Sequence, residues 1–221
     1  MPGKNIKNFN GKPLIAWAIE TAKAVERIDN VYVSTDSTEI ADIARSFGAE
    51  IPSMRPAKLS DDTSAEWLAW QHALTFLREN GDRCPDVMVS MPTTAPLRSV
   101  EDINRCIDLF EATKPDAVIT VMEAHHNPFF NMVKKLPDGR VDVCMKSGGE
   151  ISRRQDVPEI FNITTVAYLV DSLYVLNNNS LFEGIIRMIE VPVERGIDID
   201  TQLDFELAEY LARRNSNEQL P

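Results

Sequence analysis

The sequence predicts an α/β protein with a doubly wound, mainly parallel β-sheet. Short runs rich in β-branched residues alternate with amphipathic stretches along most of the 221 residues. This alternation is typical of βαβ units, in which helices cover both faces of a sheet. The chain is 43% hydrophobic and 26% charged. It therefore contains enough apolar material for the core of a single domain spanning residues 1–221.

Five short runs predict the strands of this sheet. Each contains several Val, Ile, Tyr, Thr or Met residues, which favour extended structure between polar boundaries. The runs are residues 30–35, 86–91, 117–122, 165–170 and 187–191.

Four stretches between these runs predict helices, because their apolar residues recur at helical spacing. They are residues 13–25, 37–47, 64–77 and 99–110. Gly48 follows the second stretch, where it suits the C-terminal end of a helix. Ser99 and Asp102 stand at the N-cap and N3 positions of the fourth stretch.

The alternation breaks between about residues 125 and 161, which contain turns, basic residues and a predicted hairpin around Pro137-Asp138-Gly139. This segment is too long for a plain connection, so we interpret it as an insertion. Inserted hairpins of this kind often mediate association, and we therefore expect a homodimer.

Two acidic residues, Asp198 and Asp200, stand where the last predicted strand gives way to a helix that begins after Thr201. In an extended segment their side chains share one face, with α-carbons about 6.6 Å apart. The carboxyl edge of an open α/β sheet is where ligands bind. A Mg²⁺ ion with phosphate ligands would relieve the repulsion between the two carboxylates. The alternative is a solvated strand end near a helix N-terminus, whose dipole favours acids.

Basic and polar residues supply candidate anion sites. Lys4, Lys7 and Lys12 surround two glycines just before the first helix, a position where free backbone N–H groups bind anions. Thr93 and Thr94 follow the strand at 86–91 and are expected on the same edge as Asp198. Arg98, beside the next helix, is expected to order this turn.

Further arginines fall in two other loops. Arg55 and Lys58 lie in RPAKLSDDTSAEW, and Arg153, Arg154 and Gln155 lie in SRRQD. Arginine suits carboxylate recognition because its N–H donors are paired in a plane.

Composition argues against several classes of partner. A net charge of −11 does not suit a surface for nucleic acid or for an anionic membrane. The three cysteines show no CxxC pattern, which favours reduced thiols. The first residues lack the apolar core of a signal peptide, and no run approaches the length of a membrane span. We therefore expect a cytoplasmic protein.

Seven segments, in this order, resemble the cytidylyltransferases that activate nonulosonic acids, namely the CMP-sialic acid and CMP-legionaminic acid synthetases. CMP-Kdo synthetases are a more distant relative. Together the segments cover nearly the whole chain: PGKNIKNFNGKPLIAWAIE, VYVSTDSTEIADIARSFGAE, RPAKLSDDTSAEW, PTTAPLRSVEDI, HHNPFFN, RRQDVPE and GIDIDTQLDFELAE.

The resemblance implies a nucleotide-diphospho-sugar transferase-like fold and transfer of CMP from CTP to a nine-carbon 2-keto sugar acid, with release of pyrophosphate. It implies that Asp198 and Asp200 bind Mg²⁺ and act in catalysis together with Lys4. Lys4 and Asn5 match the end of the family's phosphate loop, and Arg55, Thr93 and Thr94 fall in segments that line the nucleotide site. Arg154 and Gln155 match a substrate-facing pair in the inserted dimerisation region.

The chain departs from the family pattern at three places. Pro92 stands where most relatives have a glutamine, and Thr164 and Thr165 stand where many have an asparagine-glycine pair. Family members normally have a hydrophobic strand and the start of the phosphate loop ahead of PGKN, and here PGKN follows Met1. We therefore expect the N-terminal strand to be missing from this sequence. TAPLR and NPFFN lean toward the legionaminate branch.

A CMP-Kdo-type synthetase and three further alternative functions remain open. Without that strand, the chain would be a nucleotide-binding pseudoenzyme. DIDTQ resembles the DxDxT motif of haloacid-dehalogenase-type phosphatases, but that motif should follow the first strand and here lies near the end. A GT-A type sugar transferase also uses an acid-x-acid metal site, usually in mid-chain.

Overall fold

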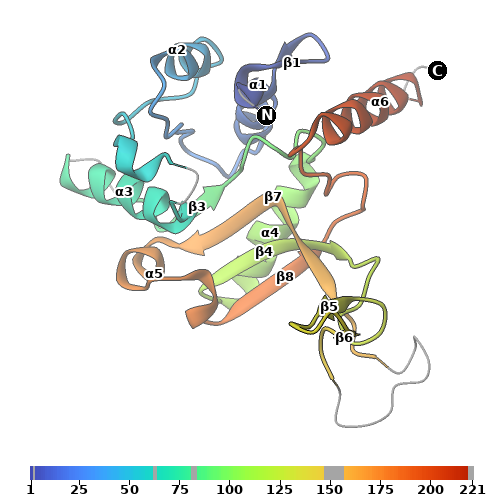
Figure 1. The fold of residues 1–221 in the computed structure, drawn as a ribbon. Coiled ribbons are helices and arrows are strands. Elements are labelled where there is room, and N and C mark those ends of the chain that lie inside the picture. The colour runs from blue at the N-terminus through green and yellow to red at the C-terminus, as the bar shows by residue number, and fades with distance from the viewer. Residues whose placement is uncertain (2, 62–63, 81–83, 147–156, 219–221) are drawn as a thin grey trace.

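A four-stranded mixed sheet forms the centre of the structure, with helices on both faces (Figure 1). The computed structural model describes residues 1, 3–61, 64–80, 84–146 and 157–218. The strand order is β3 (Val87–Ser90), β7 (Phe161–Asp171), β4 (Ala117–Glu123) and β8 (Ile186–Glu190). The α/β class predicted from the sequence is confirmed. β4 and β8 are parallel, and β3 runs in the same direction because both β3 and β4 are antiparallel to β7. Three of the four strands therefore share one direction, as predicted, and β7 alone among them makes the sheet mixed.

The insertion explains the direction of β7. After β4 the chain forms a hairpin of β5 (Val133–Lys135) and β6 (Val141–Val143), and it later returns to the sheet as β7. Antiparallel neighbours need no crossover helix, so a connection through a hairpin can bring β7 back beside β4. The predicted hairpin is confirmed, and Gly139 adopts a φ of 86° at its turn, a backbone region that favours glycine.

The predicted helices are present with small shifts at their ends. They are α1 (Leu14–Ala24), α2 (Thr38–Ser46), α3 (Glu66–Glu79), α4 (Val100–Thr113) and α6 (Gln202–Glu218). A short helix that the sequence did not predict, α5 (Ser172–Asn177), follows β7 directly. The predicted cap of α4 is a capping box: the Asp102 N–H donates to Ser99 Oγ (3.2 Å), and the Ser99 N–H donates to Asp102 Oδ2 (3.0 Å).

Smaller elements connect these helices and strands. A two-residue ladder joins β1 (Asn8–Phe9) to β2 (Lys12–Pro13) just before α1. Single 3₁₀ turns occur at Lys4–Ile6, Ala57–Leu59 and Leu181–Glu183.

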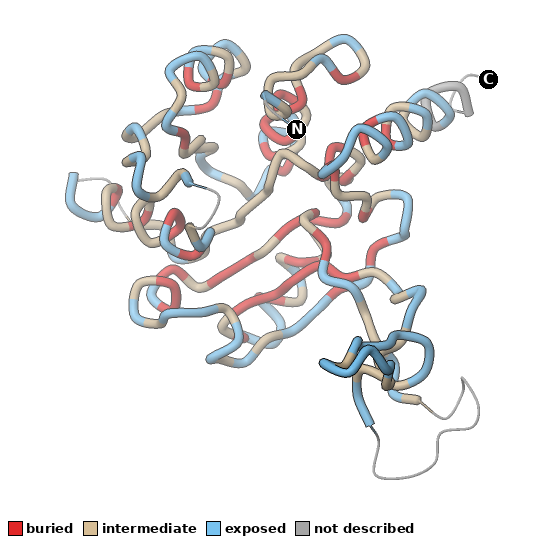
Figure 2. Tube along the Cα trace, viewed as in Figure 1, coloured by how far each residue is buried: buried red, intermediate tan, exposed pale blue. Residues whose placement is uncertain are grey.

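The core lies on both faces of the sheet, and Figure 2 shows the buried residues concentrated along its inner strands. On one face, Val118 and Leu169 pack with Ile103 and Phe110 of α4. On the other face, residues of α3 and α5 pack with Ala117 and Val170; they include Trp67, Trp70, Leu74, Tyr174 and Val175. Alternate residues of β4 and β7 thus face opposite helices, as strand geometry requires.

A buried ion pair fastens the segment after β8 to α4. The Asp102 side chain is fully buried, and its two carboxylate oxygens accept from Arg195 Nε and Nη2, each at 2.8 Å. This paired geometry is the strongest form of arginine–carboxylate contact. It fixes the position of the chain just before Asp198.

The strand predicted at residues 30–35 is absent from the sheet. The segment is extended, but it forms only isolated bridges, from Tyr32 to Glu50 and from Thr35 to Met54. Its pattern is strand-like, yet a strand also needs a neighbour with which to form a ladder. In the described part of the chain, a cavity lies beside this segment where such a neighbour would pair.

Within the described ranges, none of the helices combines the length and the apolarity needed to cross a membrane.

Candidate active site

The segment that contains Asp198 and Asp200 is held against the loop after β3. The Ile199 side chain is fully buried, and its N–H donates to the Thr94 carbonyl (2.8 Å). The prediction that this segment is the end of a strand is wrong, because β8 ends at Glu190 and a turn lies between β8 and Asp198. It nevertheless lies beside Thr94, so the two acids and the Thr93–Thr94 turn share one edge of the molecule.

Asp198 is partly buried and faces several titratable groups. Its Oδ1 atom is buried and has no hydrogen-bond partner. Burial lowers the pKa of Arg98 and raises the pKa values of Glu66 and Tyr168, and the charge of Asp198 acts to raise all three. An unpartnered buried carboxylate oxygen is costly unless a cation or donor approaches it.

Asp200 is exposed and carries an ion pair with Lys4. Its side chain is 72% exposed, and Oδ1 lies 3.1 Å from Lys4 Nζ. Lys4 Nζ also donates to the Ile199 carbonyl (2.7 Å). The structure thus brings together all three residues that were predicted to act in catalysis.

The start of α6 holds this segment in place. The Thr201 N–H and hydroxyl donate to Asp204 Oδ2 (2.7 and 2.8 Å), and the Asp200 N–H adds a longer bond (3.2 Å). These bonds, chiefly those from Thr201, lower the pKa of Asp204, so it remains a carboxylate. Thr201 is therefore the N-cap residue that the sequence predicted.

The predicted nucleotide-binding residues also meet here. The Thr93 hydroxyl donates to Asn5 Oδ1 (2.7 Å), and the Thr94 hydroxyl donates to Thr165 Oγ1 (3.3 Å). Lys4, Asn5, Arg55, Thr93 and Thr94 all line one cavity of about 1160 Å³. Arg154 and Gln155 lie outside the described residues.

Arg98 orders the turn between β3 and α4. Its side chain donates to the carbonyls of Ala95 (Nε, 2.8 Å), Thr165 (Nη2, 3.2 Å) and Pro92. Burial lowers the pKa of Arg98 to about 9, and the charges of Asp198 and Asp102 act in the opposite direction. Arg98 therefore remains a cation at neutral pH and faces Asp198. Its Nη1 atom is buried without a partner.

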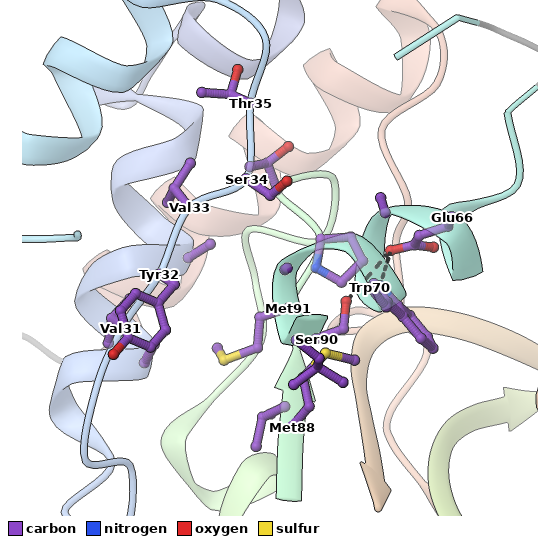
Figure 3. Close-up of a pocket in the computed structure, with 18 of the residues that line it drawn as sticks. Val31, Tyr32, Val33, Ser34, Thr35, Glu66, Trp70, Met88, Ser90 and Met91 are labelled. Atoms are coloured by element: carbon purple, nitrogen blue, oxygen red, sulfur yellow. Dashed lines mark hydrogen bonds between the residues drawn. The ribbon is translucent and has the colours of Figure 1, made fainter. Parts of the chain in front are cut away.

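Glu66, at the start of α3, belongs to the site although the sequence gave no signal for it beyond a helix start. Its Oε1 atom accepts from Trp70 Nε1 (3.2 Å) and Ser90 Oγ (3.4 Å) in the cavity wall (Figure 3). Burial raises the pKa of Glu66, and the charge of Asp198 adds to this, whereas Trp70, Ser90 and Arg55 lower it. A ring contact between Trp70 and Tyr168 lies behind this group, with centroids 5.6 Å apart.

Glu66→Gln is expected to raise the melting temperature at pH 7. A pKa raised in the folded state means that the folded chain binds more protons than the unfolded chain, so stability falls as pH rises from the unfolded toward the folded pKa of Glu66. Glutamine keeps a hydrogen-bond acceptor for Trp70 but does not titrate, so it removes the loss of folding stability at neutral pH. Thermal unfolding of both proteins at pH 7 and pH 4 checks the sign, because the gain should shrink at pH 4. An equal gain at both pH values contradicts the assignment.

The chain is similar to cytidylyltransferases. A family model described as Cytidylyltransferase matches residues 1–213. The post-translational flagellin modification protein B of Campylobacter coli is 32% identical over 96% of this chain and 89% of its own length. The CMP-N,N'-diacetyllegionaminic acid synthase of Campylobacter jejuni is 30% identical over 94% of this chain and 87% of its own length.

Two solved structures share the fold. CMP:2-keto-3-deoxy-manno-octonic acid synthetase complexed with CTP has a TM-score of 0.70 at 16% identity, over 97% of this chain and 93% of the other. The 4-diphosphocytidyl-2C-methyl-D-erythritol synthase of Anaerococcus prevotii has a TM-score of 0.66 at 17% identity, over 97% and 94% of the two chains.

Proposed function

Because this chain belongs to the cytidylyltransferase family and is thus a nucleotidyltransferase, we propose that it transfers CMP from CTP to the anomeric hydroxyl of a nonulosonic acid, with release of pyrophosphate. The observation that carries the proposal is the junction of Lys4, Asp200 and the Asp198 segment with the Thr93–Thr94 turn. Similarity to a legionaminic acid synthase supports a sugar acid of the legionaminic or sialic type.

The cavity residues are suited to a nucleoside triphosphate. Lys4 supplies positive charge for phosphate oxygens beside Asn5 and the Thr93 hydroxyl. Arg55 has a buried Nε–H without a partner, which is available to an acceptor on the nucleotide. Arg154 and Gln155 remain proposed contacts for the sugar acid.

Mg²⁺ is the proposed cofactor. Among the described residues, no group of three or more His, Cys, Asp or Glu side chains is arranged to hold a metal. Mg²⁺ needs only one or two carboxylates when phosphate oxygens and water complete its octahedron. The buried, unpartnered Oδ1 of Asp198 and the exposed carboxylate of Asp200 fit that requirement. When bound, the ion would neutralise phosphate charge during attack at the α-phosphorus.

In the proposed reaction the sugar's anomeric hydroxyl oxygen forms a bond to the α-phosphorus and gives up its proton to solvent, and the bond from that phosphorus to the oxygen that bridges to the β-phosphorus breaks. The pyrophosphate leaving group gains negative charge as it departs. Lys4, which lines the cavity beside Asn5, is the cation proposed to stabilise that charge.

A pyrophosphate-release assay with CTP and Mg²⁺ tests the proposal directly. A panel of sialic, legionaminic and Kdo acids should give turnover with a nine-carbon acid and formation of the CMP-sugar. Turnover only with Kdo would assign the eight-carbon class. No turnover with any acid would leave a nucleotide-binding pseudoenzyme, and phosphate release from simple esters would point to a phosphatase.

The hairpin of β5 and β6 is the proposed dimer contact and the core of an inserted subregion at residues 125–161. Apolar side chains are exposed on it and on the loops beside it; they are Phe130, Met132, Val133, Val141 and Met145. A contiguous group of exposed apolar side chains is typical of a contact surface.

Val141→Asp should convert the proposed homodimer to a monomer. Val141 is 64% exposed in the single chain, so the substitution costs little in the monomer but places a charge in the contact. Sedimentation velocity measures the change. Val193→Asp, at another exposed valine, is the control and should leave the assembly unchanged. An unaltered dimer in Val141→Asp would place the contact elsewhere.

A further inference from the structure

A wide bulge interrupts the pairing of β7 with β4. The register between the two strands breaks between Ile119 and Val121 of β4. Residues 164–167 of β7, which we name the β7 bulge, lie opposite Thr120 alone. β7 changes direction along its length (Figure 1). A bulge bends its strand and turns side chains in new directions, and bulges are frequent beside active sites.

The hydroxyl of Thr120 holds the β7 bulge from inside the sheet. It accepts from the Ala167 N–H (3.0 Å) and from the Thr164 hydroxyl (2.7 Å), and it donates to the Ala167 carbonyl (3.0 Å). It thus uses its one donor and both of its acceptor positions on the bulge. Thr120 is fully buried and Thr164 is buried, so water cannot replace these bonds when one partner is removed.

One side of the β7 bulge supports the segment that leads to Asp198. Gly196 packs so closely here that a β-carbon in its place would lie 3.0 Å from Thr164 Cγ2 and 3.0 Å from Met122 Sδ. A side chain at residue 196 would therefore push the two segments apart. The hydroxyl of Thr164 bonds to Thr120, which fixes the rotamer that directs the Thr164 methyl group toward Gly196.

The other side of the β7 bulge supports the Thr93–Thr94 turn. The Thr94 hydroxyl donates to Thr165 Oγ1 (3.3 Å), and the Thr165 carbonyl accepts from Arg98 Nη2 (3.2 Å). The Thr94 carbonyl accepts from the Ile199 N–H (2.8 Å), which joins the turn to the segment of Asp198. Both parts of the candidate active site therefore rest on neighbouring residues of the bulge.

We propose that Thr120 is a positioning residue, which acts through the β7 bulge to set the spacing between the Asp198 segment and the Thr93–Thr94 turn. Thr120 is not one of the residues that line the cavity, so its influence is indirect. A misplacement of reacting groups by about 1 Å can slow a reaction by about a hundredfold. The effect on turnover rests on the proposed function, whereas the effect on the spacing does not.

Thr120→Val tests the proposal, because it removes the hydroxyl and keeps the shape of the side chain. It should lower kcat for CMP transfer by about tenfold or more. It should also speed hydrogen exchange of the Ile199 amide by at least about tenfold, because that N–H bonds to the turn. Thr120→Ser keeps the hydroxyl and should restore both quantities to near their wild-type values.

Tyr174→Phe is the matched control for a loss of stability alone. The Tyr174 hydroxyl donates to the carbonyls of Ser180 and Leu181 (3.1 and 3.0 Å), and this buried residue is not part of the cavity lining. The variant should lower the urea midpoint, as Thr120→Val does, and leave kcat and the exchange of the Ile199 amide unchanged.

Thr164→Val keeps the measurement possible if Thr120→Val does not fold. Thr120 retains its bonds to Ala167 in this variant, so the exchange of the Ile199 amide should rise by a smaller factor of about three.

Three results would overturn the proposal: wild-type exchange of the Ile199 amide in Thr120→Val and Thr164→Val, equal acceleration in Tyr174→Phe, or no recovery in Thr120→Ser. Absence of turnover in the wild-type protein would instead refute the proposed function, and the exchange rates would still decide whether Thr120 sets the spacing.

Discussion

Asp200→Asn should lower kcat by about a thousandfold, or about 4 kcal/mol in transition-state stabilisation, while the fold remains intact. The side chain is 72% exposed and its main contact is the ion pair with Lys4, so little stability depends on it. Loss of the negative charge weakens the proposed Mg²⁺ site and removes the partner that positions Lys4. Steady-state pyrophosphate release, measured over a range of Mg²⁺ concentrations, gives the effect.

Asp42→Asn is the matched control, because Asp42 lies on α2 with a 74% exposed side chain that also pairs with a basic residue. It should retain full turnover. The two variants should show the same far-ultraviolet circular dichroism and the same urea midpoint. Wild-type turnover by Asp200→Asn at limiting Mg²⁺ would refute the metal-binding role.

Arg98→Met should reduce the free energy of unfolding by roughly 3–5 kcal/mol, the usual cost of breaking a buried charged network. Arg98 is only 6% exposed and donates to two backbone carbonyls of the turn that carries Thr93 and Thr94 and to one carbonyl of β7. Its removal takes away these three hydrogen bonds and a cation whose charge interacts with that of Asp198. Urea unfolding monitored by tryptophan fluorescence measures the loss.

Two further variants separate charge from geometry at this position. Arg98→Lys keeps a cation but cannot reach all three carbonyls, so it should recover only part of the stability. Arg140→Met removes an exposed arginine on the hairpin, with 78% of its side chain accessible, and should change the unfolding free energy by less than about 0.5 kcal/mol. A loss below about 1 kcal/mol in Arg98→Met would show that the turn holds its shape without this side chain.

Local signals in the sequence were sufficient for the helices and for the caps at their ends. The Ser99–Asp102 pair and the Thr201–Asp204 pair were readable because each cap lies within four residues. The expected strand ends put Thr94 on the same edge as Asp198, whereas the link of Lys4 to the two acids followed from family resemblance, since no local rule relates positions so far apart. Hydrophobic pattern also located β3, β4 and β8, each within a short run of β-branched residues.

Features that depend on distant contacts could not be predicted in this way. Residues 30–35 have the composition of a strand, but strand formation depends on a partner that pattern does not reveal. The direction of β7 depends on the route of the insertion, not on its own residues. The sequence indicated Glu66 only as part of a helix start. Its place in the cavity wall depends on distant residues: Ser90 donates a hydrogen bond to it, and the charge of Asp198 adds to the raised pKa that burial causes.

The contact between Lys4 and Asp200 joins residues that are 196 positions apart. During synthesis on a ribosome, the carboxylate emerges only after almost all of the domain has left the exit tunnel. The loop-closure entropy of so long a span must be overcome by the rest of the fold before this contact can persist. Chains that stop before Asp200 therefore lack this contact, and under the proposed function they should be inactive.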